Sequence, residues 1–312
     1  MQQSRKAILL GLLAAVFFSA TYIFNKSMAN SGGDFLWSAS LRYLITLPII
    51  LFIVFINKGL KKLIVTLMND PMPWLIWGTV GFGFFYLFLT AAASISPAWL
   101  VAGTFQLTIL SGLLISPFIY KDHRKIIPKK ALQATSIILF GVILSQIGEI
   151  KNDSPWRILL GGILIFISAT LFPLGNRMIM LYQEKQTIKL DAFQRVAGMT
   201  LGSIPLWIIV SLLAYYRSGF PPESQIIQSG IIAICSTVIA TAIFFKATAM
   251  AGNNPEILGA VEATQSIEII VTLIAEVIFL NGNSPSIIGY LGILLISFGM
   301  LFYSKISIDK KS

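Results

Sequence analysis

Residues Ala7–Met28 read AILLGLLAAVFFSATYIFNKSM, and residues Ile158–Arg177 read ILLGGILIFISATLFPLGNR. Each stretch is long enough to cross the roughly 30 Å hydrocarbon layer of a bilayer as a helix that rises about 1.5 Å per residue. Lipid offers no hydrogen-bond partners to free backbone groups, and neither stretch alternates in the way of a membrane β-strand. Both stretches therefore predict transmembrane helices. They share ILLG, SAT and N followed by K or R in one order.

Similar apolar stretches recur through the chain. Hydrophobic residues make up 56% of the 312 residues and charged residues 12%, and the mean hydropathy is +0.81. A water-soluble fold of this length needs more polar residues to cover its core. We predict an all-α integral membrane protein with about ten spans. The predicted spans are Ala7–Met28, Leu36–Ile56, Pro73–Ala93, Ala98–Ile119, Ala131–Ile147, Ile158–Leu181, Ala192–Tyr216, Ile226–Ala249, Glu256–Leu280 and Ser286–Ser304.

The basic residues of the loops are distributed unevenly between the two sides of the membrane. Cytoplasmic loops of membrane proteins carry an excess of Lys and Arg. One set of alternate loops holds Arg5, Lys6, Lys58, Lys61, Lys62, Lys121, Arg124, Lys125, Lys129, Lys130, Lys185, Lys189, Lys305, Lys310 and Lys311. The opposite set holds Lys26, Lys151, Arg157 and Arg217. We therefore expect both termini on the cytoplasmic side of the cell membrane, which requires an even number of spans.

The two halves of the chain resemble each other beyond the opening stretches. Arg42 and a later proline occupy the second span, as Arg195 and a later proline occupy the seventh, and Pro97 and Pro255 precede matching spans. A repeat of five spans crosses the membrane an odd number of times, so the second copy must be inverted. Inverted repeats are typical of transporters, whose halves move around a site near the bilayer midplane. Chance similarity of apolar segments is the alternative. The predicted repeats are residues 1–150 and 151–312.

The sequence lacks the residues that several classes of function require. The net charge of +10 arises in short loops, so it does not indicate nucleic acid as a partner. Cys235 and His123 are the single residues of their kinds, which excludes a disulfide framework, a zinc site of Cys or His, and a His-based triad. No Walker motif is present. We expect no cofactor, no metal and no enzymatic activity, although an enzyme that acts on lipid-linked substrates is a less favoured alternative.

The ninth predicted span is acidic. An ionised side chain at the centre of a spanning helix costs about 2.5–3.5 kcal/mol, so three carboxylates facing lipid would cost about 8–10 kcal/mol. At about 100° per residue the polar residues of this span share one sector of roughly 120°, and the matching fourth span carries its own polar side. The candidate residues of a solute or ion pathway on these spans are Glu262, Gln265, Glu268, Thr272 and Glu276, and Thr104, Thr108 and Ser111.

Depth in the bilayer suggests partners for two of the three carboxylates. Glu262 lies near the depth of Lys246 and Arg195, and Glu276 near that of Arg42, so we predict these ion pairs. The same residues have an alternative role in which the pairs only hold helices together. No basic residue shares the depth of Glu268, so we expect burial to favour its protonated form. A carboxylate that binds and releases a proton within the membrane is what proton coupling needs.

The chain resembles the drug/metabolite transporter superfamily. The resemblance rests on SATYIFNK in the first span, an early arginine in the second, and the closing GYLGILLISFGM, which is similar to the last span of EamA-type members. Among the branches, the ten-span multidrug-efflux-like proteins are the most similar. The resemblance implies export of small molecules by alternating access, often driven by proton entry. It also implies an acidic residue where the fourth helix leaves the membrane, which Asp122 matches. The glutamate that small four-span members carry in their first helix is absent here.

We therefore predict a secondary transporter that exports a small organic solute, a drug or a metabolite, with protons as the candidate coupling ion. An exchanger of anions or nucleotide sugars is the alternative, because Arg42, Arg195 and Lys246 are basic residues within spans. The motif of Gly198 and Gly202, spaced four apart, fits either a homodimer seam or close packing inside the bundle, and we favour the packing. Substrate identity and oligomeric state have no sequence signal.

Overall fold

The computed structural model describes residues 2–150, 153–251 and 255–309, and these residues form helices and loops without a β-strand. The elements of the first part are α1 (Gln2–Asn30), α2 (Phe35–Ile56), α3 (Leu60–Asn69), α4 (Met72–Gly78), η1 (Thr79–Phe84), α5 (Phe85–Ile95), α6 (Ala98–Phe105), α7 (Leu107–Ile119), η2 (His123–Lys125) and α8 (Lys129–Glu149). The elements of the second part are α9 (Pro155–Glu184), α10 (Ala192–Ser218), α11 (Glu223–Ile232), η3 (Ala233–Ala240), α12 (Thr241–Ala251), α13 (Pro255–Ala263), η4 (Thr264–Ser266), α14 (Ile267–Phe279) and α15 (Ile287–Asp309).

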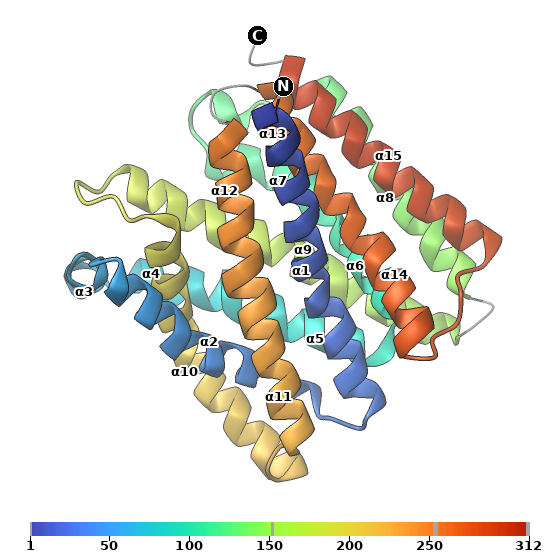
Figure 1. Cartoon of the computed structure of the whole chain (residues 1–312), viewed down its shortest axis with the longest axis horizontal. Coiled ribbons are helices and arrows are strands. Elements are labelled where there is room, and N and C mark those ends of the chain that lie inside the picture. The colour runs from blue at the N-terminus through green and yellow to red at the C-terminus, as the bar shows by residue number, and fades with distance from the viewer. Residues whose placement is uncertain (1, 151–152, 252–254, 310–312) are drawn as a thin grey trace.

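The helices confirm the predicted membrane fold. Nine helical stretches in the described residues are long and apolar enough to cross a bilayer. The ninth predicted span, Glu256–Leu280, is not among these nine stretches. It forms the continuous helical stretch α13, η4 and α14. The start of α1 and the end of α15 lie at the same end of the bundle (Figure 1), as an even number of crossings requires.

Two predicted spans are interrupted at matching places. The fourth span breaks between α6 and α7 at Gln106, nine residues after Pro97, and the ninth passes through the 3-10 turn η4 from Thr264, nine residues after Pro255. The third and eighth spans each contain a π-helical segment, η1 and η3. Such segments inside α-helices occur frequently at functional sites. No proline or glycine lies at either break. Hydropathy alone therefore does not predict the two breaks.

One helix was absent from the predicted spans. The segment LKKLIVTLMN forms α3 between the second and third spans. Its two lysines and short length place it below the threshold for a transmembrane helix, although its apolar residues recur at helical spacing. Leu63 and Thr66 are buried, and Leu63 packs into a hydrophobic cluster with Trp74, Ile179 and Leu190. Figure 1 shows α3 at the edge of the bundle.

The glycines of the last span allow it to approach α8 closely. A Cβ on Gly141 would lie 2.8 Å from the carbonyl oxygen of Gly292, and a Cβ on Gly148 would lie 2.5 Å from the nitrogen of Gly289. Larger side chains at these positions would push the two backbones apart. The glycine-rich pattern GYLGILLISFGM is therefore a packing surface against α8.

The motif of Gly198 and Gly202 packs inside the bundle. Gly198 faces the indole of Trp74 on α4, and Gly202 faces the backbone of Trp74 and Leu75. Each glycine leaves too little room for a methyl group beside its neighbours. The predicted packing role of this motif agrees with the contacts, and α4 occupies the surface that a dimer seam would need.

Replacing Gly202 with Ala is expected to lower the free energy of unfolding by about 1–3 kcal/mol, because overpacking at a rigid backbone contact forces helices apart. Thermal or denaturant unfolding of the purified protein in detergent measures this change. Gly230→Ala is the matched control, since Gly230 is helical and a Cβ there meets nothing within 4 Å. Equal stability of Gly202→Ala and the control would contradict the packing of α4 on α10.

Candidate functional site

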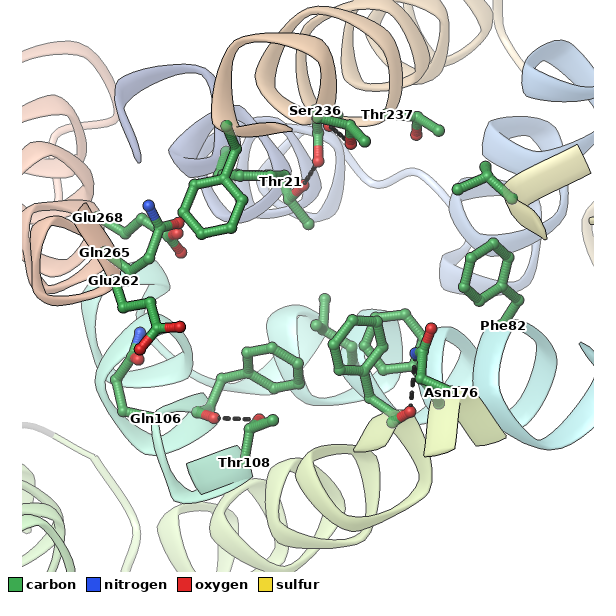
Figure 2. A pocket seen from close by; sticks show the side chains of 18 of the residues that line it. Thr21, Phe82, Gln106, Thr108, Asn176, Ser236, Thr237, Glu262, Gln265 and Glu268 are labelled. Atoms are coloured by element: carbon green, nitrogen blue, oxygen red, sulfur yellow. Dashed lines mark hydrogen bonds between the residues drawn. The ribbon is translucent and has the colours of Figure 1, made fainter. Parts of the chain in front are cut away.

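A cavity of about 600 Å³ lies at the centre of the bundle. Its wall is largely aromatic, and its residues come from both predicted halves of the chain. The aromatic lining residues are Phe18, Tyr22, Tyr43, Phe82, Phe85, Phe105, Phe172, Phe244, Phe245 and Tyr303. Figure 2 shows Glu262, Gln265 and Glu268 on one side of this space and Phe82 and Asn176 on the other. An aromatic cavity with a few polar groups suits an organic molecule with an apolar body.

Glu268 is the buried carboxylate of the cavity wall. It lies in the first turn of α14, directly after the 3-10 turn η4, and 7% of its surface is exposed. Tyr22 on α1 interacts electrostatically with it. In the described part of the chain the salt bridges do not include Glu268. The structure therefore places a carboxylate beside an aromatic cavity with a tyrosine as its partner.

The neighbours of Glu268 on the same side of the cavity are polar. Gln265 belongs to η4, and its buried Nε2 has no hydrogen-bond partner among the described residues. Glu262 on α13 lines the cavity from the preceding turn. A buried amide without a partner is costly, so the Nε2 of Gln265 is available to a molecule in the cavity.

Arg42 lines the same cavity from α2 and is held by aromatic rings and hydroxyls. Its guanidinium carbon lies 4.2 Å from the centre of the Tyr86 ring, which is a cation–π distance. Arg42 also donates to the Ser236 hydroxyl at 3.2 Å, and Thr21 donates to the same hydroxyl at 2.9 Å. The π-helical segment η3 presents Ser236 to Arg42. The buried Nε of Arg42 is left without a hydrogen-bond partner in the structure.

The predicted ion pair between Glu276 and Arg42 is wrong. The two carboxylate oxygens of Glu276 accept hydrogen bonds from the backbone nitrogens of Ala98, at 2.9 Å, and Trp99, at 3.0 Å. These are free N–H groups at the start of α6, where a helix favours an anion. Lys26 on α1 is the cation that interacts electrostatically with Glu276. Equal depth in the bilayer did not decide the partner, because Arg42 and Glu276 face different helices.

The remaining predicted residues divide between the cavity and its surroundings. Arg195 and Thr108 line the cavity together with Glu262. Lys246 is exposed and lies outside the lining. Thr104 accepts a hydrogen bond from Gln146 at 2.8 Å, and Ser111 lies 3.0 Å from the Thr170 hydroxyl. Thr104 and Ser111 thus pack against neighbouring helices. Thr272 is fully buried, and its hydroxyl has no partner among the described residues.

Sequence reasoning missed several polar residues of the cavity, including Gln106, Ser236 and Asn176. Asn176 belongs to the repeated N and K or R pair, so the repeat itself was a signal. Asn25, its counterpart in the first span, donates to the Tyr86 hydroxyl at 2.8 Å. Gln106 lies at the break of the fourth span, and neither hydropathy nor residue type predicts this break.

The cavity reaches one end of the bundle. Its lining includes Ala192 and Arg195 at the start of α10 and Tyr303 near the end of α15. The start of α10 and the end of α15 lie toward the end of the bundle at which α1 begins (Figure 1). At the opposite end, Arg217 forms a 3.2 Å ion pair with Asp34, and Glu276 caps α6. The lining of the cavity therefore extends toward the side of the termini.

A charged cluster lies at the loop between α7 and α8. Arg124 forms ion pairs with Asp122 at 2.7 Å and with Glu184 at 2.6 Å, which ties this loop to the end of α9. Its guanidinium and backbone N–H lower the pKa of Asp122 to about 2. Asp122 therefore stays ionised at any physiological pH. Asp122, the acidic residue that the family resemblance implied here, pairs with Arg124, and the pair of Arg124 with Glu184 joins the two predicted halves.

In residues 2–150, 153–251 and 255–309, no three His, Cys, Asp or Glu side chains gather in a way that could hold a metal ion.

Comparison with known proteins identifies relatives over nearly the whole chain. The model of the EmrE family of multidrug resistance efflux transporters matches residues 5–309. The uncharacterized protein YjlA of Bacillus subtilis (strain 168) is 40% identical over 315 residues, which cover 98% of this chain and 96% of that protein. An uncharacterized 42.1 kDa protein of Shouchella clausii, from the 3' region of intracellular alkaline protease, is 40% identical over 84% of this chain and 69% of its own length.

A protein of known crystal structure has the same fold. It is 16% identical and superposes with a TM-score of 0.65, covering 98% of this chain and 99% of its own. At this identity the likeness concerns the fold alone.

Proposed function

The chain belongs to the EmrE family of multidrug resistance efflux transporters, and from this premise we propose that it exports aromatic organic cations in exchange for protons. A small-molecule efflux transporter of the membrane is what the family establishes. The aromatic wall of the cavity suits the ring system of such a solute, and the carboxylates of Glu268 and Glu262 suit its positive charge. The family is one of transporters and not of enzymes.

The observation that carries this proposal is the position of Glu268. A carboxylate with 7% of its surface exposed, beside a cavity that a solute can enter, loses much of its hydration when ionised. A proton or an organic cation can neutralise it, and the two compete for the same group. Because the proton and the organic cation compete for the same carboxylate, transport of the cation is coupled to transport of the proton in the opposite direction.

Alternating access would follow from an inverted pair of five-helix halves, residues 1–150 and 151–312. The matched breaks at Gln106 and Thr264 and the π-helical segments η1 and η3 support this repeat. Interrupted helices around a central site are typical of transporters built from inverted repeats. The lining of the cavity extends toward the termini, and the distribution of Lys and Arg favours cytoplasmic termini. Both observations support an inward-facing state.

A transport assay in proteoliposomes tests the proposal. Vesicles with an acid lumen and an alkaline exterior should take up ethidium against its gradient, because protons that leave the lumen drive the solute inward. Amino acids and sugar phosphates tested in parallel should not accumulate. Uptake of ethidium that is unaffected by collapse of the pH gradient would contradict proton exchange.

An anion exchanger is the second candidate, because Arg42 and Arg195 also line the cavity. Tyr86 covers one face of the Arg42 guanidinium and Ser236 accepts from one of its N–H groups, which leaves fewer of its donors for a ligand. Glucose 6-phosphate in excess should therefore leave ethidium uptake unchanged. Strong inhibition by the sugar phosphate would favour the anion exchanger.

A further inference from the structure

A second hollow lies on the outside of the bundle, between the end of α2 and the amphipathic helix α3. Its volume is about 670 Å³, and it is separate from the central cavity. Its lining residues are Phe55, Ile56, Lys58, Leu60, Lys61, Ile64 and Val65. We call this hollow the α2–α3 groove. It combines an apolar wall with two lysines and contains no acidic residue.

The turn that joins the two helices fixes the shape of the groove. Lys58 has a left-handed backbone (φ 54°), which lets the chain turn between α2 and α3. The backbone nitrogens of Lys58 and Gly59 donate to the carbonyls of Phe55 and Val54, each at 2.9 Å. Gln194 on α10 donates to the carbonyl of Gly59 at 2.9 Å. The turn is therefore held by its own chain and by a neighbouring helix.

The inner face of α3 is anchored, and its outer face is apolar and exposed. Leu63 is fully buried against the cluster around Trp74. On the groove side, Phe55 and Ile56 are 62% and 59% exposed, and Ile64 is 45% exposed. In a membrane protein, exposed apolar side chains beside the end of a spanning helix contact acyl chains. The wall of the groove thus matches the chemistry of a lipid tail.

The charge at the rim of the groove is positive and is not balanced by the protein. Lys58, Lys61 and Lys62 are exposed, and none of them takes part in a salt bridge within the described part of the chain. Asp70 follows the far end of α3, near Tyr182, and does not line the groove. Clusters of lysine beside an amphipathic helix attract anionic headgroups.

We propose that the α2–α3 groove binds an anionic phospholipid. One acyl chain lies against Phe55, Ile56 and Ile64, and the headgroup phosphate lies between Lys58 and Lys61. A zwitterionic lipid is disfavoured, because its ammonium group would approach the same lysines. This lipid site depends on the membrane location of the protein and not on the solute that it exports. An experiment that disproves the proposed transport function would therefore leave the lipid site unaffected.

Native mass spectrometry of the full chain in detergent tests the site. Dioleoyl phosphatidylglycerol should bind at lower concentration than dioleoyl phosphatidylcholine, which has the same acyl chains. The double variant Lys58→Gln/Lys61→Gln should weaken binding of phosphatidylglycerol about tenfold or more. The double variant Lys129→Gln/Lys130→Gln is the matched control, since it removes two exposed lysines at the start of α8, and it should bind as the wild type does.

Two further arms separate a lipid from a free phosphate and a specific site from general attraction. Glycerol phosphate should not displace phosphatidylglycerol, and Ile64→Asn should weaken lipid binding without changing the unfolding temperature. Displacement by glycerol phosphate would overturn the lipid assignment. Equal binding of the two lipids, or equal losses in the two double variants, would overturn the site itself.

Discussion

Proteoliposomes that contain the Glu268→Gln variant are expected to equilibrate ethidium across the membrane but not to concentrate it. A gradient of one pH unit is worth about 1.4 kcal/mol per proton, so one-for-one exchange concentrates a solute about tenfold. Glutamine has nearly the same shape, and its side-chain oxygen is still an acceptor for a neighbouring hydroxyl such as that of Tyr22. It cannot bind or release a proton, so accumulation should fall to about onefold while passive exchange continues.

The control for this experiment is Glu223→Gln. Glu223 is an exposed carboxylate in the first turn of α11 and does not line the cavity, so its loss should leave accumulation near the wild-type value. Both variants should have the unfolding temperature of the wild type. Tenfold accumulation by Glu268→Gln would remove Glu268 as the coupling group, whatever the identity of the solute.

The sequence predicted the spans well because a bilayer imposes one strong rule. A spanning helix must satisfy its backbone internally and present about twenty apolar residues, and stretches such as Ala7–Met28 do so without reference to the rest of the chain. The helix α3 follows no such rule. The position of α3 depends on the burial of Leu63 against Trp74. This is a tertiary contact, which hydropathy along the chain does not reveal.

The sequence predicted part of the candidate site, because helical periodicity is a local property of the chain. Helical periodicity placed Glu262, Gln265 and Glu268 on one face, and all three line the cavity. Glu268 follows the 3-10 turn η4 almost directly, whereas Thr272 and Glu276 lie about one and two turns further along α14 and outside the cavity lining. A helical projection gives the face on which a residue lies but not its position along the helix relative to a cavity.

The aromatic wall shows a different limit of the sequence. Phenylalanine and tyrosine occur throughout the spans, and composition does not separate those that line a cavity from those that pack. Tyr22, Phe82 and Phe85 line the cavity. Tyr86 is fully buried and packs against the guanidinium of Arg42. Only the arrangement of helices distinguishes these roles.

Glu276→Gln is expected to lower the free energy of unfolding by about 1.5–3 kcal/mol, the value of a hydrogen bond to a charged group. Its carboxylate accepts from the nitrogens of both Ala98 and Trp99, whereas glutamine offers one oxygen and turns an NH₂ group toward the second N–H. The start of α6 should therefore loosen. Denaturant unfolding in detergent measures the stability, and hydrogen exchange of the peptide Ala98–Phe105 measures the loosening.

Thr272→Val supplies the matched control for this prediction, because Thr272 lies one turn earlier on α14 and its buried hydroxyl has no partner in the described structure. The variant removes an unsatisfied polar group at constant shape, so stability should stay the same or rise. The contact of Glu276 joins α14 to α6 at the end of the bundle that is closed here. Faster exchange in Glu276→Gln alone would show that this carboxylate holds the closed end together, whereas unchanged exchange and stability in both variants would show that α6 does not depend on it.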